Sequence, residues 1–184
     1  ILFNWLANTF VYYGISYNTS DLAGDPYLNF GLSALVELVA ILTSHFVLER
    51  FGRKIPYSMM MATTGICFIS VLFIPKNLGL LVTGLTLVSK FAISFSYNTI
   101  YIITAECHPT VIRNSSLAIC QTFSRIGTII SPNIQLLGEI FWYPLPFLIY
   151  GSISSGAVIL FIIFMPETRN QKLPDTINEF VKDE

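Results

Sequence analysis

The chain has 184 residues, of which 53% are hydrophobic and only 11% are charged, and its mean hydropathy is +0.65. A soluble domain carries roughly 25% charged residues, so this composition excludes an ordinary soluble protein and predicts a chain solvated by lipid. The net charge of −1 indicates no particular partner, and the lack of a basic patch disfavours nucleic acid. The cysteines, Cys67, Cys107 and Cys120, lack C-x-x-C spacing, so neither a disulfide framework nor a zinc site is predicted.

Six apolar runs approach the roughly 20 residues needed to cross a ~30 Å hydrocarbon core. In chain order the predicted spans are 1–17, 28–49, 55–75, 78–104, 111–137 and 144–165. The sequence therefore predicts an all-α membrane protein with six transmembrane helices over residues 1–165 and a cytoplasmic tail over residues 166–184. Because the chain opens on Ile1 inside an apolar run, we expect a fragment whose missing N-terminal part is about as long again.

Basic residues gather on one side of the predicted membrane. The ERFGRK break, the ECHPTVIRN break and the tail contain Arg50, Arg53, Lys54, Arg113, Arg169, Lys172 and Lys182, whereas the opposite side has only Lys76. By the positive-inside rule, both breaks and the C-terminus are expected to be cytoplasmic. The sequon Asn18-Thr19-Ser20 then faces outward, which makes Asn18 a candidate glycosylation site.

Three ionisable residues remain near the centres of predicted spans: Glu37, Lys90 and Arg125. Each costs at least ~2.5–3.5 kcal/mol at the middle of a bilayer, so each should face the bundle interior or a watery cavity. A purely structural alternative is a buried ion pair in which Glu37 neutralises one of the two cations. We expect Glu37 to be a structural charge partner rather than a substrate ligand.

Four spans carry a polar or aromatic stripe when the sequence is read in steps of three or four residues. The stripes are Asn4, Asn8 and Tyr12 beside Tyr13; Ser33, Glu37, Ile41 and Ser44; Lys90, Ser94, Tyr97 and Tyr101; and Gln121, Arg125, Thr128, Pro132 and Gln135. Hydrogen bonds between helices explain any single Ser or Asn. Four coinciding stripes predict an amphiphilic, net-cationic site lined by aromatic rings. This pattern is typical of transport, and no catalytic, cofactor-binding or metal-binding motif accompanies it, so an enzyme is not predicted.

The breaks between the spans carry family signatures. ERFGRK resembles the D/E-R-x-G-R-R/K loop of the major facilitator superfamily. YIITAECHPTVIRN resembles the T-A-E-L-Y-P-T-x-x-R-N signature of the organic cation/anion transporter family, the amphiphilic solute facilitators, and PETRNQKLPDT resembles the P-E-T-x-x-x-x-L-P-E/D-T ending of that family. Cys107-His108 departs from the usual Leu-Tyr. Sugar porters, the nearest alternative, are expected to show a Gln-Gln pair and a Pro-Trp motif that this chain lacks.

The resemblance covers essentially the whole chain as spans seven to twelve of a twelve-span transporter. It implies alternating access, in which the missing N-terminal six-helix half and this half rock about a site at the bilayer midplane. Cation-carrying branches typically have an aspartate at the position of Arg125, and anion-carrying branches an arginine, whose guanidinium can hold a carboxylate in bidentate fashion. Ile41 replaces a second lysine of some anion carriers, which leaves monocarboxylates or zwitterions as substrates.

The resemblance and the stripes together define the candidate residues. The predicted substrate-binding residues are Arg125, Tyr12, Tyr13, Tyr97, Asn8, Gln121 and Lys90. The predicted gating ion pairs draw on Glu49, Arg50 and Arg53 in one cytoplasmic loop and Glu106 and Arg113 in the next. The expected partners are a small organic ion and the lipid bilayer, in the plasma membrane. Two alternatives stay open: an organic cation transporter in which Arg125 pairs with Glu37, and a truncated, non-transporting half that regulates a full-length carrier.

Overall fold

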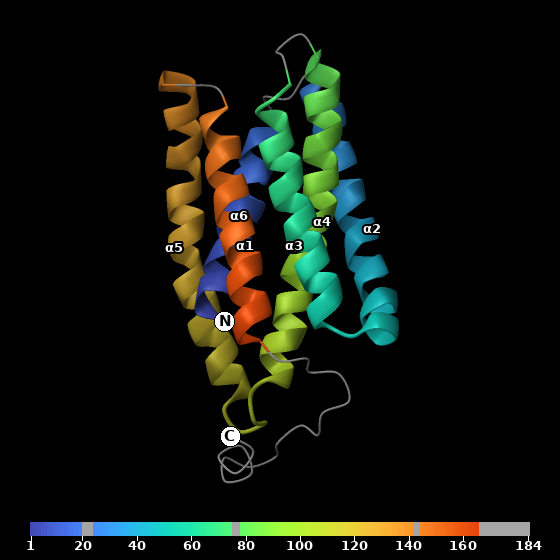
Figure 1. Cartoon of the computed structure of the whole chain (residues 1–184), viewed down its shortest axis with the longest axis vertical. Coiled ribbons are helices and arrows are strands. Elements are labelled where there is room, and N and C mark those ends of the chain that lie inside the picture. Colours follow the sequence, from blue (N-terminus) through green and yellow to red (C-terminus); the bar gives the residue numbers. More distant parts are fainter. Residues whose placement is uncertain (20–23, 75–77, 142–143, 166–184) are drawn as a thin grey trace.

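The computed structural model describes residues 1–19, 24–74, 78–141 and 144–165, and it consists of six helices that run alternately up and down one bundle (Figure 1). They are α1 (Leu2–Asn18), α2 (Pro26–Phe51), α3 (Lys54–Val71), α4 (Gly79–Glu106), α5 (Arg113–Ile140) and α6 (Leu145–Phe164). Each helix overlaps one predicted span. The largest difference is in the third span, which was expected to reach residue 75. There α3 ends at Val71, and residues 72–74 form tight turns with bonds such as Leu72 N to Ile69 O.

Local chemistry explains where α2 begins and ends. Asp25 caps its N-terminus by accepting a hydrogen bond from the backbone N–H of Tyr27 at 2.9 Å, and Pro26 occupies the first turn, where its missing N–H costs nothing. The helix ends at Phe51, and the next residue, Gly52, has a φ of +86° that a side chain would strain. Gly52 thus lets the ERFGRK segment turn sharply from α2 into α3.

Three of the described helices, α2, α4 and α6, are long and apolar enough to cross a membrane by length and composition. The prediction of six transmembrane helices is therefore not confirmed, although six helices lie side by side. For two of the three remaining helices the shortfall has a local cause. The first helix has only 17 residues, and α5 interrupts its apolar residues with polar ones such as Gln121 and Arg125.

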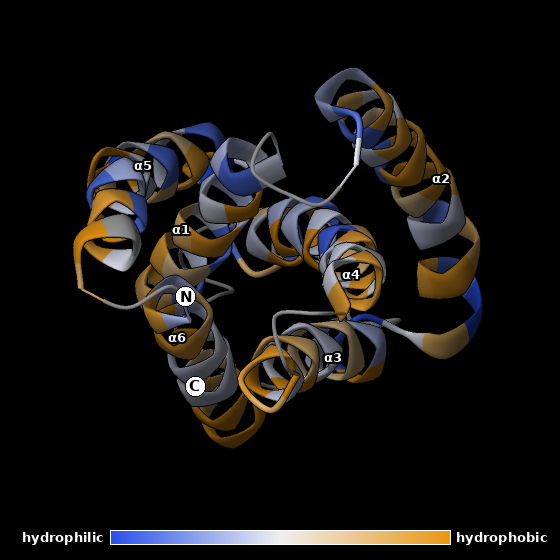
Figure 2. Cartoon of the chain, turned by 90° about the horizontal axis from the view of Figure 1, so that it is seen from above, coloured by the Kyte–Doolittle hydropathy of each residue, from blue (hydrophilic) through white to orange (hydrophobic). Residues whose placement is uncertain are grey.

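Helices α1 and α4 form the centre of the bundle. α1 contacts α4, α5 and α6, while α4 contacts α1, α2, α3 and α5. Seen from above, α5 and α2 lie on opposite sides of the α1–α4 pair, and α3 and α6 close the remaining side (Figure 2). α2 is attached to α4 and, more sparsely, to α3. Side chains of α1 accordingly reach both α2 and α5, through the Tyr12–Glu37 and Tyr13–Arg125 hydrogen bonds.

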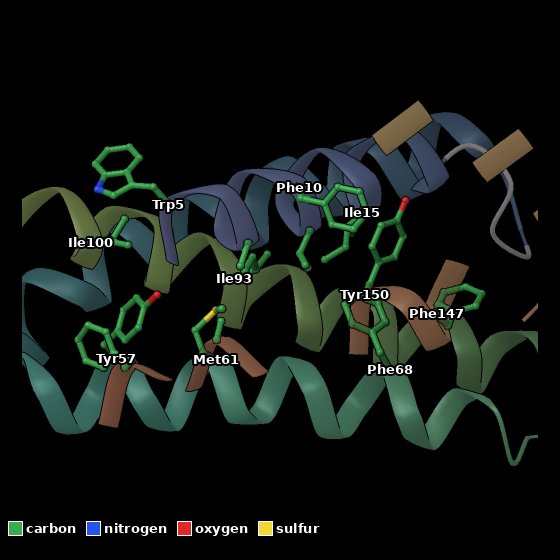
Figure 3. Packing of buried hydrophobic residues seen from close by; sticks show 14 of the residues in the cluster. Trp5, Phe10, Ile15, Tyr57, Met61, Phe68, Ile93, Ile100, Phe147 and Tyr150 are labelled. Atoms are coloured by element: carbon green, nitrogen blue, oxygen red, sulfur yellow. The ribbon is translucent and has the colours of Figure 1, made fainter. Parts of the chain in front are cut away.

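The main apolar core joins α1, α3, α4 and α6. Large aromatic side chains dominate it, as Figure 3 shows for Trp5, Phe10, Tyr57, Phe68 and Tyr150, all 4% exposed or less. Small residues allow close approach of the helices, as is common where helices pack in lipid. A Cβ added to Gly127 of α5 would lie 3.0 Å from the backbone oxygen of Leu6 in α1, so these two helices touch at their backbones. This core holds the rigid frame on which the polar stripes are displayed.

Candidate functional site

Aromatic rings from α1 and α4 form one continuous cluster, which we call the aromatic cluster: Trp5, Tyr12, Tyr13, Tyr97 and Tyr101. Tyr12 and Tyr97 stack with ring centroids 5.2 Å apart and planes 14° from parallel. Tyr101 meets Tyr97 edge-on at 5.4 Å and Trp5 edge-on at 4.5 Å, and Tyr13 meets Tyr12 edge-on at 5.4 Å. Such geometries are the ones that aromatic pairs prefer.

Glu37 and Lys90 form an ion pair that joins α2 to α4 beside this cluster. Lys90 Nζ lies 3.3 Å from Glu37 Oε2, donates to Ser16 Oγ at 2.7 Å and sits 3.9 Å from the ring centroid of Tyr12. The second carboxylate oxygen, Glu37 Oε1, accepts a hydrogen bond from the Tyr12 hydroxyl at 2.5 Å. The lysine side chain is 4% exposed and the glutamate side chain 30%. The geometry thus places Glu37 beside Lys90, and its role as a structural charge partner stays a prediction.

Arg125 occupies a different environment on α5. Its side chain is exposed, and Nη1 lies 3.4 Å from the Tyr13 hydroxyl, a long hydrogen bond. In the part of the chain that the structure describes, no carboxylate lies within 4.0 Å of the guanidinium. Glu37 is paired with Lys90 and not with Arg125, so the arrangement that the cation-transporter alternative requires is not the one observed.

The structure separates Asn8 from the other candidate binding residues. The Asn8 amide is fully buried and donates to Asn4 O at 2.9 Å and to the Tyr57 hydroxyl at 2.7 Å, so it faces α3. A helix turns about 100° per residue, so the eight residues from Asn4 to Tyr12 make two full turns and about 80° more. Asn4 therefore faces α3, whereas Tyr12 points toward α2 and α4. Gln121 lies half-exposed one turn before Arg125 on α5. Contacts therefore connect Arg125, Tyr13, Tyr12, Tyr97 and Lys90, whereas Asn8 belongs to a separate network.

Three members of this arrangement were not among the candidate binding residues. Tyr101 was on the predicted stripe, one turn beyond Tyr97, and this spacing could have selected it. Ser16 follows Tyr12 by four residues, which is the same signal. Trp5 gives no comparable signal, because its role depends on Thr104, 99 residues away, whose Oγ1 accepts a hydrogen bond from Trp5 Nε1 at 2.8 Å.

The predicted gating residues lie at the end of the bundle where α2 meets α3 and α4 meets α5. Arg53 Nη2 is 2.9 Å from Glu106 Oε1, which links these two connections, and Arg53 Nη1 donates to Leu48 O at 3.2 Å. Glu49 and Arg50 are exposed at the end of α2, and Arg113 is half-buried at the start of α5. Burial, reinforced by the charge of Glu106, raises the pKa of the adjacent Cys107 thiol to about 11, so this thiol is protonated at neutral pH.

Two further predictions concern the chain's periphery. Asn18 is 9% exposed at the end of α1, and its sequon runs into Ser20, which is outside the described residues, so glycosylation stays a prediction. The tail over 166–184, with Arg169, Lys172 and Lys182, and the outer Lys76 also lie outside the described residues.

The described residues contain no group of three or more His, Cys, Asp or Glu side chains that could hold a metal ion.

A family model described as Major Facilitator Superfamily matches residues 1–180. The chain belongs to this superfamily. Among curated relatives, "Organic cation transporter protein" of Drosophila melanogaster is 40% identical, covering 97% of this chain and 32% of the relative. "Solute carrier family 22 member 13" of Homo sapiens is 37% identical, covering 95% of this chain and 31% of the relative. "Organic cation/carnitine transporter 2" of Rattus norvegicus is 35% identical, covering 97% of this chain and 32% of the relative. These matches confirm the resemblance to the organic cation/anion transporter branch of the superfamily.

The chain spans about a third of the length of these relatives. Among solved structures, a D-xylose-proton symporter superposes with a TM-score of 0.75 at 16% identity, covering 93% of this chain and 44% of that chain. At this identity the match shows the transporter fold alone. These relatives are named as transporters or as a solute carrier, which agrees with the prediction that the chain is not an enzyme.

Proposed function

We propose that this chain is the C-terminal six-helix half of a twelve-helix transporter that carries small organic ions by alternating access, with a preference for organic anions or zwitterions. In this proposal all six helices span the membrane, and an N-terminal half completes the transport pathway. The short coverage of the relatives supports a partial chain. The bundle also leaves α2 and α5 with apolar exposed faces that suit either lipid or that second half.

The exposure of Arg125 and its weak hydrogen bonding are the observations that support a preference for carboxylate substrates. Its guanidinium is permanently charged, exposed and bound only weakly by Tyr13 at 3.4 Å, within the part of the chain described. A carboxylate can therefore bind it in bidentate fashion without first displacing another anion. The aromatic cluster begins at the same Tyr13 and offers ring surface for the organic body of the substrate. In this role Arg125 anchors the charge, while Tyr12, Tyr13 and Tyr97 contact the body.

The remaining candidate residues have supporting parts in the proposal. Gln121, one helical turn from Arg125, donates a hydrogen bond to the substrate. Lys90 lines the site as a cation that Glu37 neutralises. The Arg53–Glu106 pair opens and closes with the cytoplasmic side of the transporter. The C-terminus lies in the cytoplasm, and the plasma membrane is the proposed location.

A second candidate function is transport of organic cations. Two relatives carry "organic cation" in their names, and the Glu37 side chain, 30% exposed, is an acidic group beside aromatic rings that suit a cation. Against it stands the Glu37–Lys90 pair, because an incoming cation must compete with a lysine that is already in place.

Uptake of matched probes separates the two functions. The full-length transporter containing this chain would be expressed in cells and tested with labelled benzoate and labelled tetraethylammonium, as wild type, Arg125→Asp and Arg125→Lys. We expect wild type to carry benzoate, Arg125→Asp to lose that uptake at equal surface expression, and Arg125→Lys to keep part of it, because it retains the charge without the bidentate geometry. Uptake of tetraethylammonium alone, unaffected by Arg125→Asp, would contradict the anion preference.

A further inference from the structure

Two cations lie against neighbouring tyrosines of the aromatic cluster. Lys90 Nζ is 3.9 Å from the centroid of the Tyr12 ring, and Arg125 Nη1 is 3.4 Å from the Tyr13 hydroxyl. The two rings are in contact, with centroids 5.4 Å apart. An organic ion lying along Tyr12 and Tyr13 would therefore have one cationic group near each end. On charge alone such a site would favour a dicarboxylate.

Glu37 prevents the two cations from being equivalent. The lysine side chain is only 4% exposed, and Glu37 Oε2 faces it at 3.3 Å, while the glutamate itself is 30% exposed. Ser16 takes a second donor position of the ammonium at 2.7 Å. The other carboxylate oxygen is bound by the Tyr12 hydroxyl, which fixes the carboxylate between α1 and α4. The carboxylate that neutralises Lys90 is therefore more exposed than the lysine itself.

Removal of this anion would leave the Lys90 ammonium without compensation. A lysine ammonium in a low-dielectric interior is costly unless an anion compensates it. In the native chain that anion is Glu37. Without the carboxylate, the second carboxylate of a bound substrate becomes the available counter-charge, and a charge-assisted hydrogen bond to the ammonium is then gained on binding.

We propose that Glu37 sets the charge that the transporter accepts: by neutralising Lys90 it limits the substrate to a single carboxylate, held at Arg125, and Lys90 is a masked second anion-binding position. Glu37 acts through Lys90 and is thus a positioning residue for specificity rather than a substrate ligand. This inference rests on the proposed function of Arg125 as the anionic anchor. It names dicarboxylates as the substrate class that the native pair excludes.

The test compares benzoate with terephthalate, which share one ring and differ by one carboxylate. Full-length wild type, Glu37→Gln, Glu37→Asp and the double variant Glu37→Gln/Lys90→Met would be assayed for uptake of both labelled probes, corrected for surface expression. We expect the terephthalate-to-benzoate uptake ratio to rise about tenfold in Glu37→Gln, the effect of one added hydrogen bond to a charged group. Glu37→Asp and the double variant should keep the wild-type ratio, because each leaves Lys90 either neutralised or absent.

Binding to purified protein supplies the second measurement, since Glu37→Gln leaves a buried charge uncompensated and is expected to lower surface expression. In detergent, terephthalate should raise the Tm of Glu37→Gln more than benzoate does, and the two probes should not differ in this way for the double variant. An unchanged uptake ratio together with equal Tm shifts in Glu37→Gln would overturn the inference. A ratio that rises equally in the double variant would also overturn it, because Lys90 would then play no part.

Benzoate uptake by the Arg125→Asp variant distinguishes failure of this inference from failure of the proposed function. If wild type carries benzoate and Arg125→Asp abolishes this uptake, but Glu37→Gln gains no terephthalate, only the masking role of Glu37 fails. If benzoate is not carried at all, or its uptake does not depend on Arg125, the proposed function fails as well.

Discussion

Lys90 and Arg125 are both cations on predicted spans, and they contact the adjacent residues Tyr12 and Tyr13. Their surroundings in the structure are nevertheless opposite. Lys90 is buried on α4 and held by Glu37, Ser16 and the Tyr12 ring. Arg125 is exposed on α5 and has one long hydrogen bond to Tyr13. The difference lies in the neighbours of each charge. A cation whose counter-charge is built into the fold contributes to structure, and one without a built-in counter-charge is available to a ligand.

The two regions should therefore respond differently to substitution. Removing one partner of a buried ion pair leaves the other without compensation, which is among the most destabilising changes in a protein. Removing an exposed charge that has few contacts usually changes stability by less than about 0.5 kcal/mol. Stability and transport should consequently separate: variants at the Glu37–Lys90 pair change both, whereas variants at Arg125 change transport alone.

A large effect on stability is expected from Lys90→Met. The change leaves the Glu37 carboxylate without its cation, and since that side chain is 30% exposed the cost should fall near the lower end of ~3–5 kcal/mol. The matched control is Lys90→Met/Glu37→Gln, in which neither charge remains and most of the loss should be recovered. Thermal unfolding of the purified protein in one detergent compares the two. Equal losses in the single and double variants would mean that packing around Lys90, rather than charge, stabilises this region.

A smaller effect is expected where a buried polar contact carries no charge. Thr104 is fully buried; its hydroxyl donates to Ile100 O at 2.7 Å and accepts from Trp5 Nε1 at 2.8 Å. Thr104→Val keeps the shape but leaves the buried indole N–H without an acceptor, which costs ~1–3 kcal/mol. Thr104→Ser retains the hydroxyl and should retain most of the stability. The Tm and the fluorescence change attributable to Trp5, obtained by comparison with Trp5→Phe, check this prediction, and a valine variant with an unchanged Trp5 signal would contradict it.

Much of the fold could be predicted because long apolar runs separated by turn chemistry determine where helices lie. The ends were harder, as α3 shows by stopping at Val71 rather than at residue 75. Membrane crossing is a separate matter from helix formation. The first and fifth helices carry polar residues whose partners lie on neighbouring helices, so composition alone does not identify these two helices as spans.

The candidate site was predicted as a set of residue types but not as a set of contacts. Spacing correctly placed Tyr97 beside Tyr101, since both lie on one helix. Spacing could not decide whether Glu37 meets Lys90 or Arg125, because these belong to different helices and the choice depends on how α2 packs on α4. The same limit applies to Asn8. Four-residue steps drift around the helix, so the stripe on α1 contacts Tyr57 of α3 at Asn8 but Glu37 of α2 at Tyr12.

The smallest effect on stability, and the sharpest test of the comparison, is expected from Arg125→Gln. The side chain is exposed and makes one 3.4 Å hydrogen bond, so the free energy of unfolding should change by no more than about 0.5 kcal/mol. Benzoate uptake should nevertheless fall strongly, since glutamine cannot supply the charge that binds a carboxylate. Tm and uptake measured on the same preparations decide the matter. A Tm loss as large as that of Lys90→Met would show that Arg125 has a structural counter-charge after all, and the distinction between the two cations would then disappear.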